Sequence, residues 1–185
     1  MRMRWKNSFL ALLMMVPLSA CQQLLPKAQG LATTQWTAQQ YQRQDQVEVQ
    51  WQEHSFSFLL YQQQQDQKLE FLALSLTGQQ LFKVHFDGQK VTVEQRIDAM
   101  KLLPFEFVVR DILFATYPNF IQHPPEQVHV KQYVDAADVK IQDVEIKQQK
   151  VLNIRHFATQ IELDNLQAPY QMVFSPVPNT LENNE

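Results

Sequence analysis

The chain has 185 residues, with 16 basic and 19 acidic side chains and a formal net charge of −3. This length suits one domain with a sizeable core. The charge excludes nucleic acid as a partner, because no basic excess is present to release counterions from a phosphate backbone.

The start of the chain has the pattern of a secretory signal peptide. Three cations lie within its first seven residues, and the apolar run that follows, over 9–18, is too short to span a bilayer. Small residues then lead to the only cysteine, in the order Leu18-Ser19-Ala20-Cys21. This tetrapeptide resembles the lipobox of bacterial lipoproteins. The resemblance implies removal of residues 1–20 by cleavage between Ala20 and Cys21, and three acyl chains, palmitate among them, on Cys21.

The mature chain is expected to reach the membrane only through this lipid. The three cations leave with the signal and no acid does, so 13 basic and 19 acidic residues remain, a net charge of −6. That charge gives no reason to adhere to an anionic bilayer, whereas three acyl chains make detachment negligible. Gln22 stands where an aspartate favours the inner membrane, so the resemblance implies an outer-membrane anchor with the domain in the periplasm. Residues 21–30 form the lipidated tether, which reaches at most about 30 Å.

Strand patterns dominate the domain that follows. Thr33 and Thr34 favour a short helix over 36–44. From Gln46 the apolar period changes to two, which predicts a meander of five strands up to Val93. Alternation returns after Pro125 and supplies the remaining strands, with a change of parity at Gln142-Asp143 that indicates a turn or a bulge.

One apolar helix interrupts the strands. Residues 100–117 are apolar on almost every side, Pro104 suits a first helical turn and Pro118 suits a stop. Glu106 and Arg110 stand four apart in the favourable order and indicate a salt-bridged stripe. A helix this apolar and this short is best interpreted as filling the concave side of a sheet.

The predicted architecture is therefore mainly β, of the α+β class. We expect an antiparallel half-open β-barrel of nine or ten strands, with one or two helices over its concave face. A single domain covers residues 31–178, and a flexible tail covers 179–185.

No catalytic or metal-binding pattern is found. The five histidines lack the HExxH spacing, no GxSxG or Ser-x-x-Lys occurs, and three glycines do not make a phosphate cradle. His85 is expected to be solvent-facing. The sequence predicts a protein that is not an enzyme, with no cofactor and no metal.

Surplus apolar surface is the remaining signal. The strand over 69–76 is apolar on both faces, more than a sheet with one solvated face needs. Two interpretations stay open: the helix fills the concavity completely, or it leaves a cavity for an acyl chain. The residues expected to line such a cavity are Phe58, Leu60, Phe71, Leu74, Phe82, Phe105, Val108 and Ile112.

Two stretches carry a family resemblance. One runs from Leu74 to Gly88 and ends in L-F-x-V-x-F-D-G; the other is L-P-F-E-x-V-V-R-D-I-L-F-x-x-Y-P, from Leu103 to Pro118. Together with the lipobox they resemble a family of Gram-negative outer-membrane lipoproteins of unknown function, often encoded beside aryl-polyene or fatty-acid-like biosynthesis genes. More distantly, the order of elements is similar to that of the LolA/LolB carriers. This likeness implies a LolB-like half-barrel.

Three hypotheses follow for the function. The first is an anchored periplasmic lipoprotein that binds or hands over a lipid, acyl chain or polyene. The alternative is a non-catalytic structural or assembly lipoprotein of an envelope complex, which pairs with partners through a sheet edge. A lipid-modifying enzyme would need a polar cluster inside the sheet, and only Glu106, Arg110 and Asp111 offer one.

Overall fold

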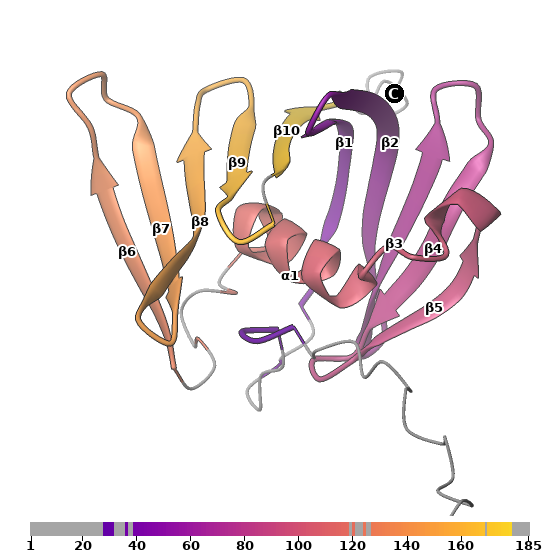
Figure 1. Cartoon of the computed structure of the whole chain (residues 1–185). Helices are drawn as coiled ribbons and strands as arrows, with labels where there is room; N and C mark the ends of the chain where they lie inside the picture. The colour runs from indigo at the N-terminus through magenta and orange to yellow at the C-terminus, as the bar shows by residue number, and fades with distance from the viewer. Residues whose placement is uncertain are drawn as a thin grey trace, which may run out of the picture.

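The computed structural model describes residues 28–31, 36, 39–118, 120, 124, 127–168 and 170–178. These residues form one ten-stranded antiparallel sheet that curls round a single α-helix (Figure 1). The sheet does not close into a barrel, so the predicted half-open architecture is confirmed. The signal peptide, Cys21 and the tail over 179–185 lie outside the described residues.

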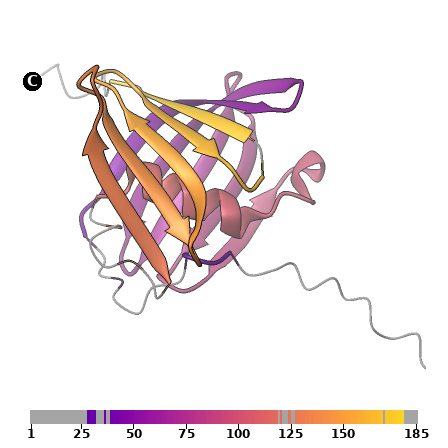
Figure 2. The same cartoon turned by 60° about the vertical axis from the view of Figure 1, so that its left-hand side comes forward.

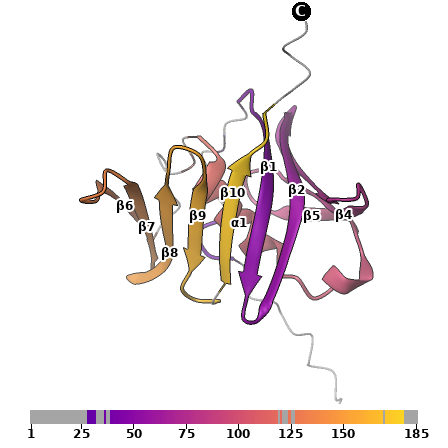
Figure 3. The ribbon, with the colours of Figure 1, turned by 90° about the horizontal axis from the view of Figure 1, so that it is seen from above.

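The strands follow a simple order. From one edge to the other it is β5-β4-β3-β2-β1-β10-β9-β8-β7-β6, so strands that lie side by side are consecutive in sequence except for the central pair of β1 and β10, and β5 and β6 form the two edges. Seen from above, the strands form an arc with the helix inside it (Figure 3). The bounds are β1 (Gln42–Trp51), β2 (His54–Gln65), β3 (Lys68–Ser75), β4 (Gln80–Phe86), β5 (Val91–Arg96), β6 (Val128–Val134), β7 (Lys140–Ile146), β8 (Gln149–His156), β9 (Ile161–Asn165) and β10 (Tyr170–Pro176).

Hydrophobic alternation sets which side of the sheet is concave. Val47 pairs with Phe58, and Phe71 lies opposite Val84; these four side chains are at most 3% exposed. A shift of one residue would turn each buried set out to solvent, so the pattern specifies the register strongly. The concave face is therefore the core face.

The helix α1 (Phe105–Thr116) lies across the concave face (Figures 1 and 2). Ten of its twelve residues are buried. It is preceded by the 3-10 helix η1 (Asp98–Met100), so it starts later than the sequence predicted. Pro104 is the N-cap residue, and Tyr117 is already extended ahead of Pro118; prolines disfavour the helical conformation at the residue before them. No helix among the described residues is long and apolar enough to cross a membrane.

Two local predictions are wrong. Residues 39–41 are not helical and β1 begins at Gln42, because pairing of Gln42 with Gln63 of β2 outweighs the weak helix preference of glutamine-rich sequence. The strand β7 also runs through Gln142 and Asp143 without a turn. The irregularity in its pairing with β8 lies between Val144 and Glu145 instead.

The chain before β1 packs against the open side of the half-barrel. Residues 28–31 form the indigo segment below α1 in Figure 1, with Ala28 and Leu31 at most 6% exposed. The ring of Trp36 stacks on Tyr117 at 5.0 Å between centroids, and its Nε1 donates to the carbonyl of Gln67 at 3.2 Å. The segment is thus part of the folded core.

Two glycines provide a test of this packing. Gly78 and Gly88 both have positive φ, 86° and 92°, so alanine strains the backbone at either site by about 1–2 kcal/mol. A Cβ at Gly88 would also overlap the Cβ of Trp36, whereas nothing lies within 4 Å of a Cβ at Gly78. We expect Gly88→Ala to lower the free energy of unfolding clearly more than Gly78→Ala, measured by urea denaturation. Equal losses would contradict the packing of Trp36 on this turn.

Candidate functional site

The apolar concave face contains seven of the eight residues predicted to line a cavity. Phe58, Leu60 and Phe71 come from β2 and β3, and each is at most 3% exposed. Leu74 is different: it is half-buried on the outer face, because it alternates with the buried Phe71 and Ala73. Phe82 and the helix residues Phe105, Val108 and Ile112 complete the inward-facing set, all at most 7% exposed and all in one core cluster.

Four aromatic rings form a chain from the surface to the helix. Phe56 stacks on Phe58 at 6.2 Å, Phe58 meets Phe82 edge-on at 6.1 Å, and Phe82 meets Phe105 edge-on at 5.2 Å. Phe56 is 41% exposed and Phe105 is 5% exposed. The rings therefore lead from solvent, along the concave face, to the first turn of α1.

Two exposed apolar residues, Trp51 and Phe56, lie at the outer end of this aromatic chain, and we call them the apolar mouth. We call the end of the half-barrel that holds the β1–β2, β3–β4, β7–β8 and β9–β10 turns the hairpin end. Trp51, the last residue of β1, lies there and is 52% exposed. Its partner in register is Tyr170, whose hydroxyl points to the helix. Trp51 and Phe56 thus extend the concave face beyond the part that α1 covers.

A buried polar network holds the middle of α1 to the sheet. The Asp111 carboxylate, fully buried, accepts hydrogen bonds from Asn165 Nδ2 at 2.6 Å and from the hydroxyl of Tyr170. It also forms an ion pair with Arg110, Oδ1 to Nε at 2.7 Å. Burial raises the pKa of Asp111, and the three donors oppose that shift. Burial and the neighbouring carboxylate raise the pKa of Tyr170 well above its ordinary value, so its hydroxyl remains a donor.

Glu106 and Arg110 bind the N-terminal segment and not each other. The Glu106 carboxylate accepts from the backbone N–H of Ala28 at 3.1 Å, and Arg110 Nη1 donates to the carbonyl of Gln29 at 3.2 Å. No ion pair joins the two side chains within the described part of the chain. The stripe expected on a solvated helix face is instead a pair of contacts that fix residues 28 and 29 on α1.

The two halves of α1 are held differently. Towards its C-terminus, Thr116 Oγ1 is 3.0 Å from Gln62 Oε1, and Gln142 Nε2 donates to the carbonyl of Phe114 at 3.1 Å. Towards its N-terminus, Phe105 and Val108 are buried among the apolar side chains of the core, and Pro104 provides no side-chain cap. Glu106 makes the polar side-chain contact of that first turn. The first turn is therefore held on the sheet by apolar packing, whereas the polar contacts of Glu106 and Arg110 hold the N-terminal segment.

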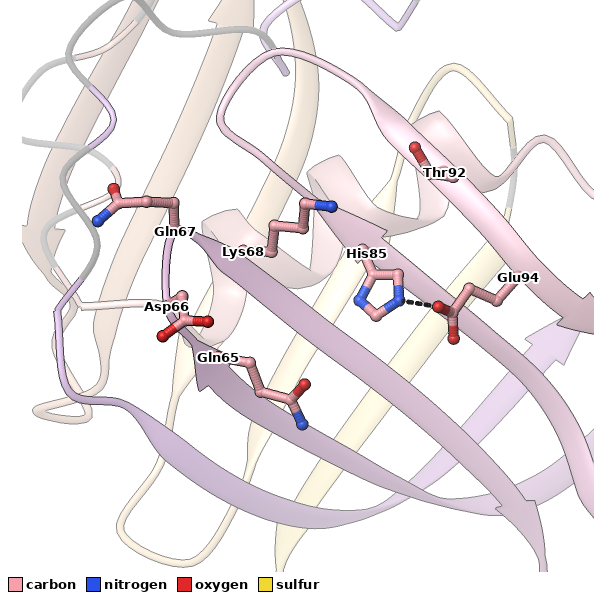
Figure 4. A pocket seen from close by; sticks show the side chains of 7 residues that line it. All are labelled: Gln65, Asp66, Gln67, Lys68, His85, Thr92 and Glu94. Carbon is pink, nitrogen blue, oxygen red and sulfur yellow. Dashed lines mark ion pairs between the residues drawn. The ribbon is translucent and has the colours of Figure 1, made fainter.

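A second, polar site lies on the outer face of β3, β4 and β5 (Figure 4). His85 Nε2 is 2.7 Å from Glu94 Oε1, and its Nδ1 is 3.9 Å from Glu70 Oε2. The Lys83 ammonium lies 2.9 Å from Glu70 and 3.2 Å from Glu94. His85 and Glu94 also line a pocket of about 420 Å³ next to the β2–β3 turn, together with Thr92 and residues 65–68. His85, predicted to face solvent, lies on the outer face but contacts both carboxylates and is only 14% exposed in its side chain.

This outer cluster is an ion-pair network with its own cation. Potential ligand atoms of Glu70, His85 and Glu94 lie within 4.8 Å of one another, a spacing that suits a metal ion. The Lys83 ammonium, however, already pairs with both carboxylates, and its hydrogen bond to Glu70 raises the pKa of Lys83. The contact from His85 lowers the pKa of Glu94 in turn. A bound metal would have to displace Lys83.

Fold and site together define a mostly β protein in which one helix lies in the apolar concave face of a half-open antiparallel barrel. This fits the LolB-like architecture expected from the sequence. The chain belongs to the family described as "Protein of unknown function (DUF3261)", which it matches over residues 42–178. No curated protein matches it.

The buried network predicts a large asymmetry between two aspartates. Asp111→Ala leaves Arg110 buried without its counter-charge, and removal of one partner of a buried pair typically costs about 3–5 kcal/mol. Asp98 pairs with Lys101 in η1 and is 91% exposed in its side chain, so Asp98→Ala should leave stability unchanged. Thermal and urea unfolding of both variants measures this difference. Equal stability would show that Asp111 does not hold α1.

Buried phenols predict a loss of stability at alkaline pH. Burial raises the pKa of Tyr41 to about 12, and that of Tyr170 is raised well above 10. Their stabilisation is complete below the unfolded pKa of about 10 and is lost as pH rises, by up to about 1.4 kcal/mol per pH unit for each group. We expect the free energy of unfolding to fall from pH 10 to 12, and less steeply in Tyr41→Phe. The control is Tyr133→Phe, at a residue 39% exposed.

Proposed function

We propose that this protein is a lipoprotein held in the outer membrane by acylated Cys21, with its half-barrel in the periplasm. The half-barrel binds a hydrophobic chain, such as a lipid, an acyl chain or a polyene, between α1 and the sheet. The observation that carries this proposal is the chain of four aromatic rings from exposed Phe56 to buried Phe105.

The arrangement of α1 supports binding by displacement. Its C-terminal half is fixed to the sheet through Asp111, Thr116 and the carbonyl of Phe114, whereas its first turn meets the sheet through apolar side chains such as Phe105. An acyl chain entering at Trp51 and Phe56 would meet Phe58 and then Phe82, and would replace the contacts of Phe105. Replacing one apolar contact by another costs little free energy, because hydrophobic burial is non-directional.

The lining supports binding rather than catalysis. The charged groups of α1 that reach the core, Arg110 and Asp111, both make contacts that fasten the helix: Arg110 donates to Asp111 and to the carbonyl of Gln29, and Asp111 accepts from Asn165. Asp111 carries no exposed surface from which to reach a substrate. The proposed activity is therefore binding or transfer of an unchanged hydrophobic ligand.

The structural alternative has its own observation. The strand β6 is an edge of the sheet, pairs only with β7 among the described strands, and leaves Tyr133 and Val134 exposed. Unpaired edges are templates for a strand of another chain. A stable partner crosslinked along β6, together with no lipid uptake, would favour an assembly role.

Ligand binding can be tested at the mouth. Phe56→Ser should lower the affinity for a fluorescent fatty-acid probe about tenfold, because burial of a phenyl ring contributes roughly 1.5–3 kcal/mol. Phe157→Ser is the matched control, since Phe157 is 39% exposed against 41% for Phe56 but lies in the β8–β9 turn at the opposite end. Native mass spectrometry of the purified protein should show co-purified lipid. A clean unliganded mass, with no probe uptake, would overturn the proposal.

A further inference from the structure

Five exposed apolar side chains lie at the hairpin end of the half-barrel. They come from four separate connections: the β1–β2 hairpin, the β3–β4 turn, the segment between η1 and α1, and the β9–β10 turn. Figure 2 shows the first, third and fourth of these at its right-hand side. We call these residues the apolar rim: Trp51 (52% exposed), Phe56 (41%), Leu76 (60%), Leu102 (94%) and Leu166 (53%).

The chain leading to the anchor also meets the domain at this end. Gly30 packs against Ile146, the last residue of β7, and Val128, the first of β6. Ala28 is held by Glu106 in the first turn of α1. Cys21 stands seven residues before Ala28, which is at most about 25 Å of extended chain. An acyl anchor on Cys21 therefore keeps the hairpin end close to the bilayer.

The charges of the connecting turns differ between the two ends. Three exposed cations lie at the hairpin end: Arg96, Lys101 and Lys147. The acids in its turns and in η1 are Glu53 and Asp98. At the opposite end, each of the β2–β3, β4–β5 and β6–β7 connections contains aspartate, against one cation, Lys90; the aspartates are Asp66, Asp87, Asp135 and Asp138. Although the mature chain is acidic overall, the hairpin end, which carries the rim, is less acidic than the opposite end. It is therefore the end that an anionic lipid surface would repel less.

From these observations we infer that the apolar rim lies in the interface of the anchoring bilayer, with the mouth of the concave face opening onto lipid. Tryptophan and leucine side chains at one end, together with nearby cations, suit the boundary between headgroups and acyl chains. The inference rests on the proposed function, because it needs the anchor on Cys21. It adds that the domain has one fixed orientation, in which a hydrophobic chain passes between bilayer and half-barrel without crossing water.

Trp51 supplies an internal probe of this contact. After loss of the signal peptide the tryptophans are Trp36, packed beneath α1 against Tyr117, and Trp51 on the rim. The acylated protein is reconstituted into phosphatidylethanolamine–phosphatidylglycerol vesicles that contain lipids brominated on the acyl chain. In the Trp36→Phe variant only Trp51 emits, and in the Trp51→Phe variant only Trp36 emits. We expect the emission of Trp51 to be quenched several-fold more strongly than that of Trp36.

Two further variants separate the rim from general apolar surface. In the Trp36→Phe background, Leu76→Ser with Leu102→Ser should reduce quenching of Trp51 towards the Trp36 value. The same background with Val134→Ser and Phe157→Ser, exposed apolar residues of the opposite end, should leave the quenching of Trp51 unchanged.

Vesicle-bound protein whose Trp51 is not quenched would overturn the inference while leaving the anchor intact. Protein that does not float with vesicles, and whose N-terminal peptide lacks acyl mass, would overturn the anchor itself. A rim that crosslinks to another protein and is not quenched would identify a protein interface.

Discussion

An open antiparallel sheet must cover its apolar concave face, and here that task falls to α1. A sheet of ten strands with unpaired edges at β5 and β6 cannot bury its inner face by closing on itself. The helix supplies the missing layer, which explains why ten of its twelve residues are buried. The buried side chains of the sheet and those of the helix therefore form one core cluster.

Apolar packing alone would not fix the helix in one position, because hydrophobic contacts are non-directional. Directional contacts come from Asp111, which joins α1 to β9 and β10, and from Glu106 and Arg110, which join it to the chain before β1. Helix, sheet and N-terminal segment thus form one connected unit. Because that segment leads to Cys21, the same contacts that hold α1 also determine where an anchor would pull on the domain.

The asymmetry of α1 links this framework to the proposed function. Polar contacts to the sheet gather in its middle and C-terminal parts, while its first turn packs on Phe82 of the sheet. A helix fixed to the sheet by polar contacts at one end, and packed on the sheet by apolar side chains at the other, suits a protein that must admit a hydrophobic chain without unfolding. The outer cluster round His85 is separate from this system and contains its own cation, Lys83.

Local patterning alone determined the fold class. The period of two placed Phe58 and Phe71 on the buried face correctly, and prolines 104 and 118 bracketed the helix, because alternation and proline chemistry act over a few residues. What only the tertiary structure decided were the contacts over long distances in sequence. Leu74 could not be placed because β3 is apolar on both faces, so parity there carries no information. Gln142 and Asp111 are buried because partners far away in sequence, Phe114 and Asn165, satisfy their polar atoms. A polar residue is tolerated in a core only when a partner satisfies its hydrogen bonds, and the fold determines whether such a partner lies within reach.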